Sequence, residues 1–129
     1  MPYIPKERRD AAYFHPVNAG ELNYAITMRL IEETQFDFNR SWFSIQLWKL
    51  LNDYWNNHGQ NYQAINDCSG AMHEAVAEFE RRIKNAKWVY NTRIIALTVM
   101  DDFRKRTVEA YEDGKIQTNG DVYPEGMTR

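Results

Sequence analysis

The chain has 129 residues and a net charge of −2, with 43% hydrophobic and 26% charged residues, which predicts one globular domain and excludes a disordered chain. Cys68 is the only cysteine, which excludes an intrachain disulfide and a zinc site built from several cysteines of one chain. The N-terminal residues lack the apolar run of a secretory signal and no segment is apolar enough to span a bilayer, so we expect a cytoplasmic protein without membrane contact.

Residues 1–20 carry three of the four prolines and no sustained periodicity. We predict that they form an irregular N-terminal arm that lies against the body of the domain. Asn18 or Gly20 is a suitable cap for a first helix over about residues 21–35, and Glu21 in its first turn interacts favourably with the helix dipole. The apolar face of this helix consists of Leu22, Ala25, Ile26 and Leu30, with the stem of Arg29 beside them.

The segment from Ser41 to Trp55 predicts a second helix that is apolar around most of its circumference. Its two stripes are Phe43, Leu47, Leu50 and Tyr54, and Ile45, Trp48, Leu51 and Trp55. A surface helix needs only one such stripe. Either the helix is central in the domain, or the second stripe contacts another chain and forms an oligomer or partner interface.

Residues 62–83 have the clearest periodicity of the chain, and they predict a helix packed lengthwise in a bundle. Its apolar seam consists of Tyr62, Ile65, Ser69, Met72, Val76, Phe79 and Ile83. Gly70 lies inside this helix and costs about 1 kcal/mol relative to alanine. We expect the close approach of another helix to explain this glycine.

Residues 88–100 are rich in β-branched and aromatic side chains and would also suit a strand. A single strand has no partner elsewhere in the chain, and Ile95, Val99 and Phe103 keep helical spacing, so we predict a long fourth helix ending near residue 113. Residues 115–129 form a loop tail, in which Asn119 to Tyr123 is either a site or a docking turn. The sequence therefore predicts an all-α bundle of about four helices in one domain, residues 1–129.

Acidic residues one helical turn apart could hold magnesium, as in all-α nucleotide pyrophosphohydrolases. The candidate ligands are Glu74, Glu78, Glu109, Glu112 and Asp113. No complete motif is present, and such acids are usually solvated or paired with arginines. We therefore expect no metal cofactor and keep the enzyme as an alternative.

Covalent catalysis has little support in the sequence. No Gly-x-Ser-x-Gly motif occurs, and the three histidines lie in different predicted elements. Cys68 lies beside the seam of a core helix, where we expect a buried, unreactive thiol.

Eight lysines and arginines stand against two aspartates between residues 81 and 106. Trp88 and Tyr90 lie among these cations, a combination that can neutralise phosphates and stack on a base. Basic side chains beside an apolar seam also simply keep a helix soluble. If a ligand binds, we predict stacking by Trp88 or Tyr90, specificity from Asn23 or Tyr24, and charge contacts from four arginines. These arginines are Arg81, Arg82, Arg104 and Arg106.

Several short segments of the chain form recognisable motifs. They are Met1-Pro2-Tyr3-Ile4, Gly20 to Thr27, Tyr62 with Asn66 and Gly70, Glu78-Phe79 with Arg81-Arg82, Tyr111 to Ile116, and Asn119 to Tyr123. In these segments the chain resembles a family of small uncharacterised proteins found mainly in tailed bacteriophages and prophages. The interval from Arg82 to Tyr111 is longer than in that family. The resemblance implies a phage gene product without an established activity.

We therefore expect a non-enzymatic phage accessory protein in the cytoplasm of the infected bacterial host. It would counter host defence by binding a protein partner or by sequestering an anionic nucleotide-like ligand, with nucleic acid less favoured. We also expect a homo-oligomer, because of the second apolar stripe. The alternatives are a magnesium-dependent pyrophosphohydrolase-like enzyme and a purely structural or oligomeric phage protein.

Overall fold

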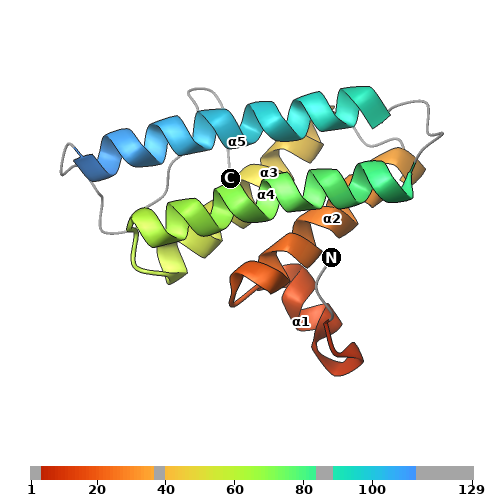
Figure 1. Cartoon of the computed structure of the whole chain (residues 1–129), viewed down its shortest axis with the longest axis horizontal. Helices are drawn as coiled ribbons and strands as arrows, with labels where there is room; N and C mark the ends of the chain where they lie inside the picture. The colour runs from red at the N-terminus through yellow and green to blue at the C-terminus, as the bar shows by residue number, and fades with distance from the viewer. Residues whose placement is uncertain (1–3, 37–39, 84–88, 113–129) are drawn as a thin grey trace.

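The computed structural model describes residues 4–36, 40–83 and 89–112, and the regular structure in these ranges is helical (Figure 1). A short 3-10 helix, η1 (Lys6–Arg8), leads into α1 (Arg9–Phe14). The longer helices are α2 (Ala19–Phe36), α3 (Arg40–Asn57), α4 (Tyr62–Arg82) and α5 (Val89–Glu112). The predicted all-α class is confirmed, while the expected count of about four is corrected to five α-helices in the described ranges. None of the helices described is long and apolar enough to cross a membrane.

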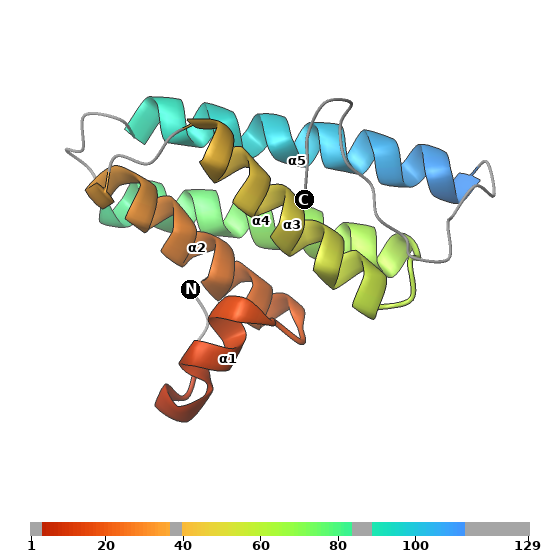
Figure 2. The same ribbon diagram turned by 180° about the vertical axis from the view of Figure 1, so that it is seen from behind.

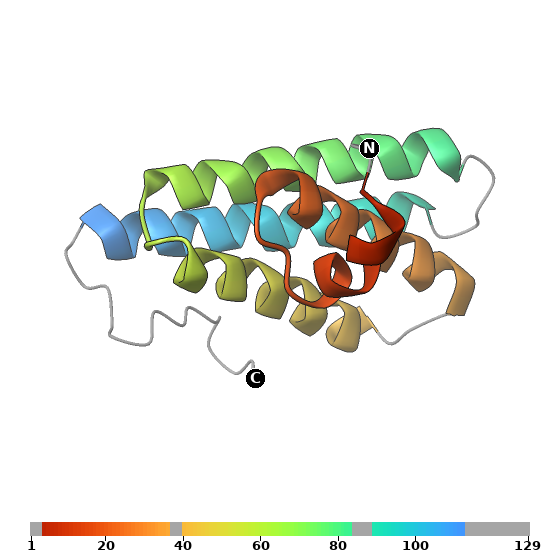
Figure 3. The ribbon, with the colours of Figure 1, turned by 90° about the horizontal axis from the view of Figure 1, so that it is seen from below.

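The N-terminal arm, residues 4–17, contains helix where we predicted an irregular chain. The six residues of α1 are too few to form a stable helix alone, so contacts with α2 must hold them in place. Arg8 donates to both carboxylate oxygens of Glu21, at 3.1 and 2.9 Å, and Ala12 is buried. Figure 3 shows the arm lying across one side of the molecule.

Side-chain caps mark the starts of two helices. Asn18 Oδ1 accepts from the Glu21 amide at 2.8 Å, which confirms the predicted cap of α2. Asn61 caps α4 in the same way by accepting from the Ala64 amide at 3.0 Å. Between α3 and α4 the chain turns through Gly59, whose φ of +89° lies in the region that favours glycine.

Helix α3 packs against α2, α4 and α5, and Figure 2 shows it in front of α4 and beside α2. Trp48, Leu51 and Trp55 are at most 2% exposed, and Phe103 of α5 packs edge-on against both tryptophans, with ring centroids 5.5 and 6.4 Å away. Packing against three helices therefore accounts for the two apolar stripes. These three side chains leave no surface for the interface that the sequence suggested, and only Ile45 of that stripe is half-buried.

Helices α4 and α5 lie side by side and run antiparallel (Figure 1). At one end Tyr62 donates to Glu112 at 3.0 Å, and at the other Arg93 forms an ion pair with Glu80 at 2.9 Å. The helical prediction for residues 88–100 is confirmed from Val89 onward. The tail, residues 115–129, lies outside the described residues.

Candidate functional site

The four arginines of the predicted ligand site lie in two separate places. Arg81 and Arg82 end α4, whereas Arg104 of α5 contacts Asn66 at 3.3 Å and Arg106 follows one half-turn later. Asn66 precedes Arg82 by sixteen residues, which separates them by roughly 24 Å along the helix. The structure does not bring the four cations together.

Local carboxylates also neutralise much of the positive charge between residues 81 and 106. Arg81 and Arg82 both form ion pairs with Glu78, Arg82 at 2.7 Å. Arg106 forms an ion pair with Asp102 at 3.3 Å. These pairs leave less positive charge for a ligand than the sequence count indicates.

The other predicted ligand residues are similarly dispersed. Asn23 is buried, and its Nδ2 donates to Glu74 at 3.1 Å across the α2–α4 contact. Tyr24 is half-buried on α2, and Tyr90 is exposed at the start of α5. Trp88 lies outside the described residues.

The alternative metal ligands are also divided. Glu74 and Glu78 lie in the second half of α4. Glu112 of α5 instead contacts Tyr62, the first residue of α4. Glu109 lies one turn before Glu112 on α5. Asp113 lies outside the described residues. Within the described ranges, no group of three His, Cys, Asp or Glu side chains could hold a metal ion.

Cys68 is fully buried, as the sequence predicted. Burial is the main cause that raises the pKa of this thiol, and the charge of Asp67 adds to it. The thiolate, which is the nucleophilic form, is therefore strongly disfavoured.

A groove of about 420 Å³ lies between the N-terminal arm and α3. Phe14 and Trp42, which are 62% and 54% exposed, belong to its two sides. The residues that line it are Tyr13, Phe14, His15, Arg29, Trp42, Ile45, Gln46, Lys49, Leu50 and Asp53. We call this surface the α1–α3 groove.

Helix α3 supplies one wall of the α1–α3 groove because one arc of its circumference is left over from the core. Trp42, Gln46, Lys49 and Asp53 follow one another at spacings of three and four residues, so they share one face of the helix. Lys49 is exposed and Asp53 is half-buried. This wall therefore presents an aromatic ring, an amide, a cation and a carboxylate in sequence.

Arg29 of α2 also lines the groove and is only 9% exposed. Its Nη1 donates to the carbonyl oxygens of Tyr13 at 2.9 Å and Ala25 at 3.1 Å. The guanidinium carbon lies 4.1 Å from the centre of the Tyr13 ring. Burial lowers the pKa of Arg29, and the Tyr13 hydroxyl and Glu32 oppose this only through longer-range attraction. Arg29 forms no ion pair with any carboxylate of the described residues.

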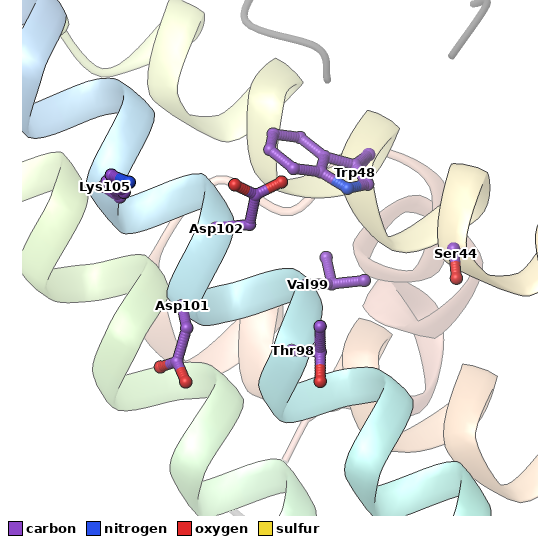
Figure 4. Close-up of a pocket in the computed structure, with 7 residues that line it drawn as sticks. All are labelled: Ser44, Trp48, Thr98, Val99, Asp101, Asp102 and Lys105. Carbon is purple, nitrogen blue, oxygen red and sulfur yellow. The ribbon is translucent and has the colours of Figure 1, made fainter. Parts of the chain in front are cut away.

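A second groove, of about 530 Å³, lies between α3 and α5 (Figure 4). In Figure 4 Asp102 points toward the Trp48 ring and Asp101 points away from it. Asp102 is already paired with Arg106. The lining residues are Ser44, Trp48, Thr98, Val99, Asp101, Asp102 and Lys105.

A third groove, of about 440 Å³, lies between the start of α2 and α4. Gly70 opens into it, and a methyl group added there would meet nothing within 4 Å. The expectation that another helix approaches Gly70 closely is therefore wrong. The carboxylates of this groove have internal partners, because Asp67 accepts from Tyr54 at 2.9 Å and Glu74 from Asn23 at 3.1 Å. The lining residues are Ala19, Gly20, Asn66, Asp67, Gly70, Ala71 and Glu74.

The α1–α3 groove differs from the other two because a buried cation that forms no ion pair among the described residues, Arg29, and two exposed aromatic side chains line it. Residue patterns do not predict this groove, because only Arg29, a charged residue on an apolar helix face, indicates it.

Comparisons with known proteins place few constraints on the chain. A family model described as Domain of unknown function (DUF6899) matches residues 1–122. No curated protein and no solved structure matches.

Proposed function

Because the chain belongs to the family of the Domain of unknown function (DUF6899), it inherits no assigned activity, and we propose from its own geometry that it is a non-enzymatic binding protein. The α1–α3 groove is its binding surface. The observation that supports this is the pair of exposed aromatic side chains, Phe14 and Trp42, on the two sides of one groove. Exposed apolar surface that gathers around a concavity marks a binding site more often than scattered exposed residues do.

The setting of this function follows from the resemblance to bacteriophage and prophage proteins. The protein acts in the cytoplasm of an infected bacterium, as a phage accessory protein. By binding in the groove it sequesters a host molecule or blocks a host component, and this counters a host defence. Fold alone does not support this step, which rests on the setting.

Two other functions have less support. A magnesium-dependent hydrolase would need its carboxylates together, and Glu74 lies far from Glu109 and Glu112 along the α4–α5 pair. An oligomer would need another apolar surface than the buried tryptophan stripe. Tyr90 and Ile94 of α5, which are 67% and 43% exposed, are one such surface.

The test compares groove variants with a matched surface variant, each purified from infected host cells and weighed by native mass spectrometry. Trp42→Ser and Phe14→Ser remove exposed rings from the groove, and Tyr90→Ser removes an equally exposed ring elsewhere. We expect the wild type and Tyr90→Ser to retain the same bound species and the two groove variants to lose it. Retention by all four proteins would overturn the proposal.

A second assay separates binding from catalysis. The purified protein is incubated with nucleoside triphosphates and magnesium, and the nucleotides are measured over time. We expect them to remain intact. Hydrolysis that Glu74→Gln abolishes would instead establish the enzyme and contradict the proposed function.

A further inference from the structure

We propose that the α1–α3 groove binds a nucleoside phosphate, with Arg29 and Lys49 contacting the anion and the aromatic side chains contacting the ring. This inference rests on the proposed binding function and names the chemical class of the ligand. It is carried by an unbalanced buried charge, by the residues around it and by the size of the groove.

The unbalanced charge is the guanidinium of Arg29. A cation that is nine-tenths buried is costly unless a counter-ion compensates it. Arg29 forms no direct ion pair among the described residues, and Glu32 attracts it only at longer range. Guanidinium has five N–H donors, and among the described residues only Nη1 has acceptors, the carbonyls of Tyr13 and Ala25. The bond to Tyr13 links α1 to α2, but it uses only the Nη1 nitrogen. The remaining donors belong to a side chain that lines the groove, where an anion would supply the missing charge.

Lys49 provides a second cation in the same groove. It is exposed, and it forms no ion pair with Asp53 one turn later on α3, nor with another carboxylate in the described part of the chain. Among the described residues that line the groove, two cations, Arg29 and Lys49, therefore stand against one carboxylate, Asp53. Such a balance favours an anionic ligand over a neutral or cationic one.

The rings and the volume favour a nucleotide over an acidic peptide. Phe14 and Trp42 offer exposed aromatic faces near the cations, and bases stack on such side chains whatever their sequence. A volume of about 420 Å³ falls in the range of roughly 300–1,000 Å³ typical of small-molecule sites. A protein partner would need a far larger contact surface.

Isothermal titration calorimetry with the four ribonucleoside 5′-monophosphates tests the inference. We expect at least one of them to bind the wild type. Lys49→Gln should bind it roughly ten- to hundredfold more weakly, because a charge-assisted hydrogen bond is lost. Lys105→Gln is the matched control, since Lys105 is an exposed lysine in the groove between α3 and α5, and it should bind like the wild type.

Arg29→Lys tests the second contact, because it keeps the positive charge but loses the planar set of donors. We expect weaker binding with an unchanged circular dichroism spectrum. If this variant fails to fold, the Lys49 pair still decides the question. Equal affinities of the wild type and Lys49→Gln would overturn the inference.

Further outcomes separate this inference from the proposed function. If no monophosphate binds, yet Trp42→Ser loses a species that the wild type retains from infected cells, the inference fails and the binding function stands. Binding of a Glu- and Trp-containing peptide but of no nucleotide would likewise overturn the inference. A single-stranded hexanucleotide could bind more tightly than the monophosphates, and Lys49→Gln could weaken that binding. This outcome would support the phosphate contacts and identify a nucleic-acid strand as the ligand that provides the phosphates.

Discussion

Gly70 lies in the middle of α4 with open space where a side chain would project. A glycine in a helix interior loses about 1 kcal/mol relative to alanine, and no close packing at this position offsets that loss. We therefore predict that Gly70→Ala raises the free energy of unfolding by about 1 kcal/mol, measured by denaturant titration.

Gly59→Ala is the control for this prediction. The φ of Gly59 is +89°, so a side chain there is strained and the variant should be less stable than the wild type. A loss of stability in Gly70→Ala would contradict the open space described at that position.

Arg29 illustrates what residue patterns can and cannot reveal. Its position on the apolar face of α2 was visible in the sequence, and so was the aliphatic stem that packs there. The proposed role of its guanidinium in the groove depends on Tyr13, sixteen residues earlier, and on Lys49 in the next long helix. No local pattern links these three side chains.

At the scale of helices, the four long elements could be predicted to within a few residues, because caps such as Asn18 and seams such as Ile65, Met72 and Phe79 are local signals. Helix α1 could not, because its stability comes from contacts with α2. The distribution of positive charge could not be predicted either. Only the antiparallel packing of α4 and α5 shows that Arg82 and Arg104 lie at different ends.

The contact between the arm and α2 predicts a local dependence on pH. The hydrogen bond from Arg8 is the main cause that lowers the pKa of Glu21, the Val17 amide adds to it, and burial opposes it. Because the folded pKa lies below the ordinary value of 4.5, the ionised carboxylate stabilises the docked arm above that pH. This stabilisation is lost as the pH falls through the folded pKa.

Amide hydrogen exchange of residues 8–17 measures this effect. We expect the protection of these amides relative to their intrinsic exchange rates to fall below about pH 4.5 in the wild type, and to be low at every pH in Glu21→Gln. Glu80→Gln removes a carboxylate that pairs with Arg93 of α5 and not with Arg8 of the arm, so it should leave these amides unchanged. An identical pH profile in Glu21→Gln and the wild type would disprove the link.

For the whole molecule, the aromatic contact of Phe103 with Trp48 and Trp55 joins α5 to α3. Phe103 is fully buried, and Phe103→Ala should lower the free energy of unfolding by about 3–5 kcal/mol. Tyr90→Ala, on the exposed side of the same helix, should change it by about 0.5 kcal/mol or less. Comparable losses in the two variants, followed by thermal and denaturant unfolding, would be incompatible with this core.

The described residues that line the α1–α3 groove all belong to the first half of the chain, between Tyr13 and Asp53. Helices α4 and α5 follow later in the sequence and share the core with α2 and α3. In evolutionary terms, the proposed recognition surface is therefore encoded in one stretch of the gene, before the turn at Gly59. Recombination within this turn would exchange that surface together with the core side chains of α2 and α3, which the new segment would have to match to α4 and α5.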